Sequence, residues 1–177
     1  LPNGHVVPAL AMGNTVVWKP SELAPAVAAW IASAWKQAGL PPGVLELVYG
    51  AGETGRMLAV HPDVDGVLFT GSSAVGQALA RATLAQPGKL LALELGGKNG
   101  VLVLADADLD LALAETALSI CATTGQRCSS ASRIFVEASL FDRFSERLSG
   151  LLRGVRLGHP LEDGVFMGPL VSVRAHE

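Results

Sequence analysis

Short apolar segments alternate with segments of helical periodicity along almost the whole chain, and this alternation limits the possible folds more than any other feature. The apolar segments are expected to be strands at residues 14–18, 44–49, 66–70, 90–95, 100–104 and 132–136. The segments between and after them are expected to be helices at residues 25–38, 54–60, 71–84, 106–121 and 140–153. Strands separated by helices form parallel βαβ units, so the sequence predicts an α/β fold, a parallel sheet with flanking helices.

The composition indicates a chain that buries a large core. Apolar residues make up 50% of the sequence and charged residues only 16%, against about 25% charged residues in an ordinary globular domain. This composition excludes disorder. It also indicates that much of the surface meets a partner or that the chain is part of something larger. Because the pattern begins and stops without a closing element, we expect an internal fragment with an incomplete domain.

Charge and cysteine content argue against several functional classes. The formal net charge is −3, whereas nucleic-acid binding needs a basic face. No segment is apolar over the length that a membrane-spanning helix needs, and no signal peptide is recognisable. The two cysteines, Cys121 and Cys128, form neither a disulfide framework nor a metal-ligand pair. We therefore expect no metal site, no membrane or nucleic-acid partner, and a reducing, cytoplasmic location.

Two glycine-containing turns follow predicted strands and precede predicted helices, where backbone N–H groups can bind phosphate. The first turn has the pattern GxGxxG at residues 50–55. It lacks the acidic residue about 20 positions later that would hold a ribose, so a tight strand-to-helix turn is favoured. The second turn is a candidate pyrophosphate site, with an ordinary helix N-cap as the alternative. It consists of Gly71, Ser72, Ser73, Ala74, Val75 and Gly76.

Two charged residues follow the first predicted strand. Lys19 could hold a phosphate or a ribose hydroxyl, and Glu22 could accept a hydrogen bond from a ribose 2′-hydroxyl. A carboxylate at this place repels a 2′-phosphate, so it favours NAD over NADP without excluding NADP. The alternative is the charged start of an ordinary helix.

Cys128 and Glu94 are the candidate catalytic residues. Cys128 lies in a polar turn beside Arg127, where a neighbouring positive charge favours the nucleophilic thiolate. Cys121 lies in an apolar helix and is expected to be a buried structural cysteine. Glu94 interrupts an apolar strand, where burial would suit it to general-base catalysis. A strand-end residue that faces water is the alternative.

Together and in this order, these segments resemble the aldehyde dehydrogenase superfamily over essentially the whole chain. The matching segments are residues 13–22, 69–72 with 76, 93–98, 125–128 and 168–170. Residues 1–10 and 37–45 are most similar to the branch that oxidises N-succinylglutamate 5-semialdehyde in arginine catabolism. That branch usually has two asparagines after the glycine pair and a second cysteine after the nucleophile, whereas this chain has Lys98-Asn99 and Ser130.

The resemblance implies a division of the chain and a role for each candidate residue. Residues 1–96 would be the C-terminal part of a Rossmann-type NAD-binding domain, and residues 97–177 the N-terminal part of a catalytic domain. Cys128 would attack a small-molecule aldehyde, and its backbone N–H would stabilise the oxyanion. Glu94 would activate the water that hydrolyses the thioester. Lys19 and Glu22 would hold the adenosine ribose, and residues 71–76 would meet the pyrophosphate.

The resemblance also implies a full-length protein more than twice this long that forms a homo-oligomer. A second oxyanion donor and the glutamate that holds the nicotinamide ribose would lie outside the chain, so we expect weak or no turnover by the chain alone. Three alternatives stay open. They are a fragment that binds only a nucleotide or a partner, a cysteine-dependent acyl transferase, and a family member that acts on a different semialdehyde or transfers its product to coenzyme A.

Overall fold

The computed structural model describes residues 2–176, apart from the side chain of Arg174. The chain forms two compact units, divided between Leu95 and Gly96. This division lies within one residue of the expected boundary between residues 96 and 97. The assignment of the first unit to a cofactor-binding domain and of the second to a catalytic domain stays a prediction.

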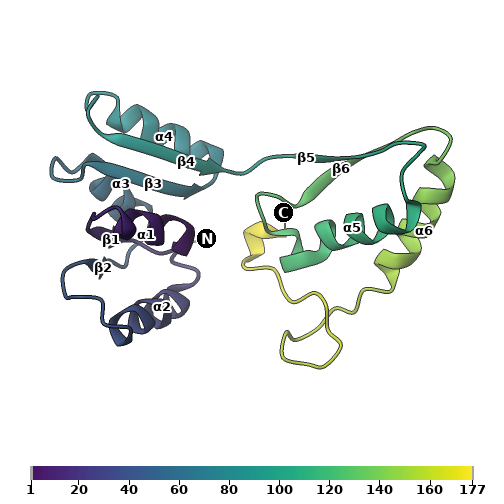
Figure 1. Cartoon of the computed structure of the whole chain (residues 1–177), viewed down its shortest axis with the longest axis horizontal. Coiled ribbons are helices and arrows are strands. Elements are labelled where there is room, and N and C mark those ends of the chain that lie inside the picture. Colours follow the sequence, from purple (N-terminus) through teal and green to yellow (C-terminus); the bar gives the residue numbers. More distant parts are fainter. Residues whose placement is uncertain (1, 177) are drawn as a thin grey trace. The chain divides into compact units, whose positions relative to one another are not determined.

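The first unit begins with helix α1 (Pro2–Ala11) and continues through two βαβ units (Figure 1). The first of these and the helix that follows it are β1 (Val16–Trp18), α2 (Pro25–Gln37), β2 (Leu45–Leu47) and α3 (Gly52–Val60). The second comprises β3 (Gly66–Gly71), α4 (Ser73–Thr83) and β4 (Leu90–Leu95). In each of these two βαβ units the strands pair in parallel, with Val16 opposite Leu45 in the first and Gly66 opposite Leu90 in the second.

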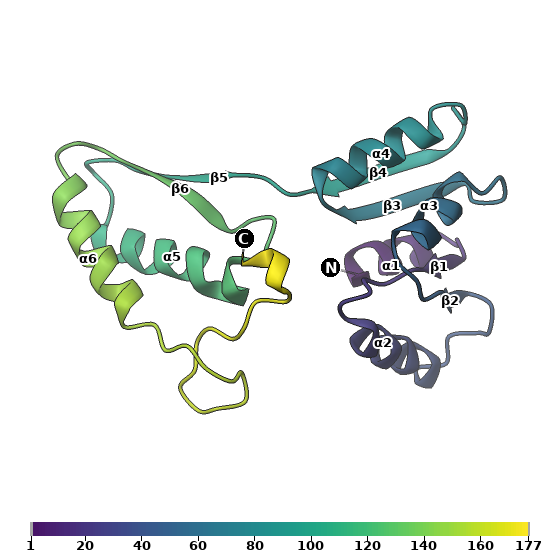
Figure 2. The ribbon, with the colours of Figure 1, turned by 180° about the vertical axis from the view of Figure 1, so that it is seen from behind.

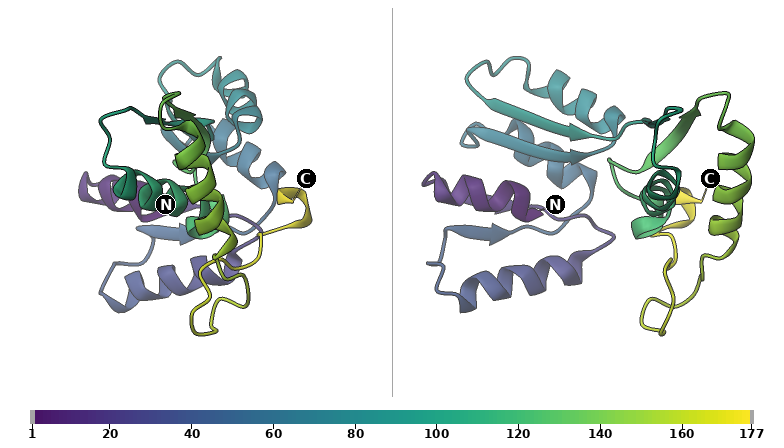
Figure 3. Two further views of the ribbon diagram at one scale, coloured as in Figure 1. Left: turned by 90° about the vertical axis from the view of Figure 1, so that its right-hand side faces the viewer. Right: turned by 45° about the vertical axis from the view of Figure 1, so that its right-hand side comes forward.

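The second unit is one βαβ unit followed by a helix and a long C-terminal segment. Its elements are β5 (Asn99–Val103), α5 (Leu109–Cys121), the short 3-10 segment η1 (Ala122–Gly125), β6 (Ala131–Val136), α6 (Phe141–Arg153) and the 3-10 turn η2 (Val173–Ala175). Strands β5 and β6 pair in parallel, with a register shift after Asn99. Helix α6 packs beside α5 (Figure 3).

The predicted α/β architecture with parallel strands is confirmed, but the described residues form three separate two-stranded sheets and not one continuous sheet. A crossover helix connects the two strands of each pair. Helix α4, for example, connects β3 to β4 and contacts both strands (Figure 2). Apolar side chains such as Leu68, Leu102 and Phe135 are exposed on the strands. The helices of the described chain therefore do not cover both faces of these sheets, as parallel sheets normally require.

Helix α1 has no counterpart among the expected elements. It contains Gly4 and Pro8, and a proline inside a helix removes one backbone hydrogen bond. Tertiary contacts hold the helix instead, because Val6 is buried and His5 Nε2 lies 2.8 Å from Thr70 Oγ1 of β3. Packing has thus overridden a poor local propensity. Within residues 2–176, no helix has the length and apolar character needed to cross a membrane.

The core of the second unit lies where α5 and α6 meet the β5–β6 pair. Its buried members are Val103, Leu113, Phe144 and Leu148. Phe144 and Leu148 are four residues apart on α6 and therefore share one face of the helix. At the edge of this core, Arg147 Nη2 of α6 lies 2.5 Å from Asp110 Oδ1 of α5. This packing fixes α5, whose end leads into the segment that carries Cys128.

Replacing Phe144 by alanine is predicted to lower the free energy of unfolding by about 3–5 kcal/mol, because it removes a buried ring and leaves a cavity. Phe144 is 1% exposed, whereas Phe141 on the same helix is 54% exposed. Phe141→Ala is the matched control and should cost less than about 1 kcal/mol. Urea unfolding followed by circular dichroism measures both values. Equal losses for the two variants would contradict this account of the core.

Candidate functional site

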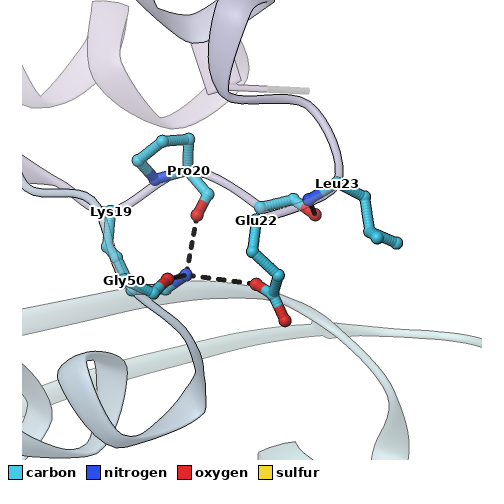
Figure 4. A network of polar contacts seen from close by, with 6 residues as sticks. Lys19, Pro20, Glu22, Leu23 and Gly50 are labelled. Carbon is cyan, nitrogen blue, oxygen red and sulfur yellow. Dashed lines mark hydrogen bonds and ion pairs between the residues drawn. The ribbon is translucent and has the colours of Figure 1, made fainter.

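Lys19 and Glu22 form one polar network at the end of β1 (Figure 4). Lys19 Nζ donates hydrogen bonds to the carbonyl oxygens of Pro20 at 2.6 Å and Gly50 at 2.9 Å, and it lies 3.6 Å from Glu22 Oε2. Because Gly50 follows β2, these contacts join the ends of two paired strands. The Lys19 ammonium group is thus engaged by protein acceptors, and the exposed carboxylate of Glu22 is the group of the pair that faces solvent.

The Lys19 network favours the ionised form of Glu22. Its backbone hydrogen bond, and then the charge of Lys19, lower the pKa of Glu22 below its ordinary value. The side chain therefore carries a full negative charge at neutral pH. An exposed, ionised carboxylate can accept hydrogen bonds from the hydroxyls of a sugar and repels a phosphate group.

The GxGxxG segment is the tight strand-to-helix turn that the sequence favours. Helix α3 already begins at Gly52, inside the motif. A Cβ atom on Gly50 would lie 2.0 Å from Thr54 Oγ1, so the turn closes on itself too tightly for a side chain. A Cβ atom on Gly55 would lie 3.5 Å from Lys19 Cε, which places this turn against the Lys19 network.

The turn at residues 71–76 joins β3 to α4. Ser72 is the N-cap of α4, since its Oγ accepts a hydrogen bond from Val75 N at 3.3 Å. The N–H groups of Ser73 and Ala74 lie in the first helical turn, where backbone donors have no intrahelical acceptor and can bind an anion. Gly76 serves packing, because a Cβ atom there would lie 2.6 Å from Leu95 Cδ2 of β4. The N-cap interpretation therefore holds for Ser72, and the anion-binding role stays a prediction.

Cys128 lies in an exposed turn between η1 and β6. The side-chain amide of Asn99 donates to the carbonyl oxygens of Cys128 at 2.5 Å and Ser130 at 3.1 Å. Inside the turn, Ser130 N donates to Arg127 O at 3.1 Å, and Arg127 N donates to Ser130 Oγ at 3.3 Å. The thiol thus meets solvent, while the backbone that carries it is held by hydrogen bonds.

The backbone just before Cys128 is strained. Three successive residues have left-handed conformations, with φ of 53°, 60° and 68° at Thr123, Thr124 and Gly125. Such a conformation costs a residue other than glycine on the order of 1–3 kcal/mol, and it persists only where surrounding contacts impose it. Residues 168–171 supply such contacts: Thr124 Oγ1 donates to Gly168 O at 3.4 Å, and Val171 N donates to Gln126 Oε1 at 3.0 Å.

Cys121 has the opposite environment to that of Cys128. It is 4% exposed at the end of α5, and burial raises the pKa of its thiol. A raised pKa lowers the fraction of thiolate, which is the reactive form. The expected burial of Cys121 is confirmed, so the two cysteines of the chain differ sharply in access to solvent.

Glu94 lies near the end of β4, opposite Thr70 of β3, and its side chain is exposed. The interpretation of Glu94 as a buried acid is therefore wrong, and the alternative of a strand-end residue facing water is correct. Alternation along the strand explains this, because Leu93 and Leu95 occupy the half-buried face and Glu94 the other. Glu94 belongs to the first unit with Lys19, Glu22 and residues 71–76, and Cys128 belongs to the second.

Two groups at these sites were not among the candidates from sequence. They are the carbonyl of Gly50, which holds Lys19, and the amide of Asn99, which holds the Cys128 turn. Each contact joins residues about thirty positions apart, and no periodicity indicates such a partner. The one available signal for Asn99 is its place two residues after the Gly96-Gly97 pair, at the start of a strand.

Comparison with known sequences gives a match along the whole chain. A family model described as "Aldehyde dehydrogenase family" matches residues 1–177. The N-succinylglutamate 5-semialdehyde dehydrogenase of Sphingopyxis alaskensis is 46% identical over 176 residues, which cover 99% of this chain and 37% of that protein.

Solved structures give the same result. HpcC from Thermus thermophilus matches with a TM-score of 0.90 and 43% identity, covering 95% of this chain and 33% of that one. PnpE in complex with nicotinamide adenine dinucleotide matches with a TM-score of 0.91 and 39% identity, covering 95% of this chain and 34% of that one. The chain therefore spans about a third of the length of the proteins it matches.

Glu22 is predicted to titrate below its ordinary pKa of 4.5. Because the pKa is lower in the folded than in the unfolded chain, ionised Glu22 stabilises the fold above the unfolded pKa, and this contribution is lost as the pH falls through the folded pKa. Lys19→Met should move the midpoint part of the way back up, since the backbone hydrogen bond remains. NMR of the carboxyl carbon measures the midpoint, with Lys36→Met as the control. An ordinary midpoint in the unmodified protein would contradict the prediction.

Proposed function

This chain belongs to the aldehyde dehydrogenase family, and we propose that the protein carrying it oxidises an aldehyde to a carboxylic acid with NAD. The observation that carries the proposal is the environment of Cys128. Its thiol is exposed on a turn that the Asn99 amide and Ser130 hold, whereas Cys121 is buried. The exposed cysteine is thus the one suited to attack a substrate.

Cys128 acts as the nucleophile in this proposal. Its thiolate attacks the carbonyl carbon, a C–S bond forms, and the carbonyl electron pair moves onto oxygen to give a thiohemiacetal. The backbone N–H of Cys128 donates to the negative oxygen. When bound, NAD supplies the acceptor for the hydride that the thiohemiacetal loses, and a thioester remains on Cys128.

Glu94 acts as the general base that completes the reaction. Its carboxylate takes a proton from water, and the water oxygen attacks the thioester carbon. The C–S bond then breaks, which releases the carboxylic acid and restores the Cys128 thiolate. Membership of the aldehyde dehydrogenase family supports this role, and the exposure of Glu94 on β4 leaves its carboxylate open to water.

The first unit offers groups that would hold the adenosine ribose and the pyrophosphate of NAD. Glu22 presents an exposed carboxylate that would accept hydrogen bonds from the adenosine ribose, and Lys19 holds the loop through Gly50. The first turn of α4 would offer the N–H groups of Ser73 and Ala74 to the pyrophosphate. The remaining members of that turn, Gly71, Ser72, Val75 and Gly76, shape it. Because the Glu22 carboxylate repels a 2′-phosphate, we propose NAD over NADP.

We propose N-succinylglutamate 5-semialdehyde as the substrate. Three curated relatives that bear the name N-succinylglutamate 5-semialdehyde dehydrogenase are 41–48% identical to this chain over nearly its whole length. The test is a comparison of kcat/KM with that of an uncharged aldehyde such as propionaldehyde. We expect a preference of at least about tenfold, equivalent to 1.4 kcal/mol. An equal or reversed ratio would overturn the substrate assignment alone.

Cys128→Ala is predicted to lower turnover by about 10⁴-fold or more, because loss of a covalent nucleophile disables the whole mechanism. Cys121→Ala is the matched control and should stay within about threefold of the unmodified enzyme, since a buried cysteine away from the chemistry contributes only packing. NADH formation in the gene product that contains this chain measures both. Turnover that survives in Cys128→Ala would overturn the proposed function.

Glu94→Gln is predicted to separate the two halves of the reaction. The first NADH equivalent should form in a burst, because Cys128 is intact, while steady-state turnover falls about 10²–10⁴-fold for lack of the base. Glu46→Gln changes another exposed strand glutamate, on β2, and should leave both phases unaltered. If Glu94→Gln abolished the burst as well as steady-state turnover, Glu94 would not act in hydrolysis alone, which would contradict the prediction.

A further inference from the structure

We propose that Asn99 is a positioning residue for Cys128, an inference that rests on the proposed role of Cys128 as nucleophile. Cys128 is exposed, so packing against its side chain does little to fix the direction of the thiol. The thiol is instead directed by its backbone. Among the described residues, Asn99 is the one residue outside 127–130 whose side chain bonds to the Cys128 peptide.

The Asn99 side-chain amide holds the turn through two hydrogen bonds, which we call the Asn99 clamp. Its nitrogen carries two hydrogens and donates to Cys128 O at 2.5 Å and to Ser130 O at 3.1 Å. Two carbonyls that lie two residues apart are thereby drawn to one atom, which fixes the peptide planes after Cys128. A carboxylate in the same place has no hydrogen to donate and would repel both carbonyl oxygens.

Asn99 is itself held, so it can serve as a fixed point. It is the first residue of β5, opposite Ala131, and the register then shifts so that Gly100 lies opposite Arg133. Ser132, the residue left over by this shift, donates from its hydroxyl to Asn99 O at 3.4 Å. On the other side, Arg133 Nε donates to Lys98 O at 3.1 Å. The bulge thus aims Asn99 at the turn.

The Asn99 clamp holds the chain at and after Cys128, while the contacts of Gly168 and Val171 hold the strained segment before it. The left-handed residues Thr123 and Thr124 favour relaxation of the loop toward ordinary conformations. Without the amide, the Cys128 peptide can rotate and the thiol leaves its line of attack. Misplacement of a reacting group by about 1 Å can lower the rate about 10²-fold.

The test uses Asn99→Asp and Asn99→Ala in the gene product that contains this chain. In both variants kcat should fall about 10–100-fold, with the KM for the aldehyde within about threefold. Alkylation of Cys128 by iodoacetamide should change less than about threefold, because that small reagent attacks from any direction. Ser119→Ala is the control: it removes the acceptor for Ala131 N at 3.1 Å but no bond to the Cys128 turn, and kcat should not change.

Cys121 reports whether either variant acts only through the fold. Peptide mass spectrometry follows alkylation of the two cysteines separately, and a positioning role leaves Cys121 protected. The proposal is overturned if kcat is unchanged in both variants, or if Cys121 becomes as reactive as Cys128 in both. If the proposed function itself is wrong, the result is different: Cys128→Ala retains turnover.

Discussion

Parallel pairing of two strands across a helix is the constraint on which every candidate site depends. Parallel strands place all their carboxyl ends at one edge, where loops can gather functional groups. In the first unit, Lys19 and Glu22 follow β1, Gly50 follows β2 and residues 71–76 close β3, while Glu94 lies near the end of β4. The candidate cofactor groups of this unit are therefore a consequence of its topology.

The second unit uses the opposite ends of its strands. Asn99 opens β5 and Cys128 lies just before β6, so the same parallel register that pairs Asn99 with Ala131 brings the asparagine amide to the cysteine turn. The core formed by Leu113, Phe144 and Leu148 holds α5 against this pair. The exposed nucleophile candidate thus depends on strand register and on packing some distance away, as well as on the hydrogen bonds inside its own turn.

Most elements were predictable because their sequence patterns are local. Apolar runs located the six paired strands of the described residues, and Ser72 is the helix N-cap that its turn allowed for. Helix α1 was not predictable, since His5 and Val6 hold it by contacts that no local pattern contains. The exposure of Glu94 and the partners of Asn99 also depend on which strands pair. Residue types identified the chemistry, but only the register could show what each residue contacts.

Apolar residues such as Leu68, Leu102 and Phe135 are exposed on the strands. The chain spans about a third of the length of its relatives, and the remaining two thirds of such a protein could cover these faces. The central claim is that Cys128 forms a thioester with the oxidised substrate, and trapping that thioester tests it most directly. The gene product would be mixed with NAD and N-succinylglutamate 5-semialdehyde, quenched in acid and analysed by peptide mass spectrometry. We predict an acyl adduct on Cys128 that forms only with NAD present and is removed by hydroxylamine. Steady NADH formation with Cys128 unmodified throughout, and the adduct on another residue, would contradict the account.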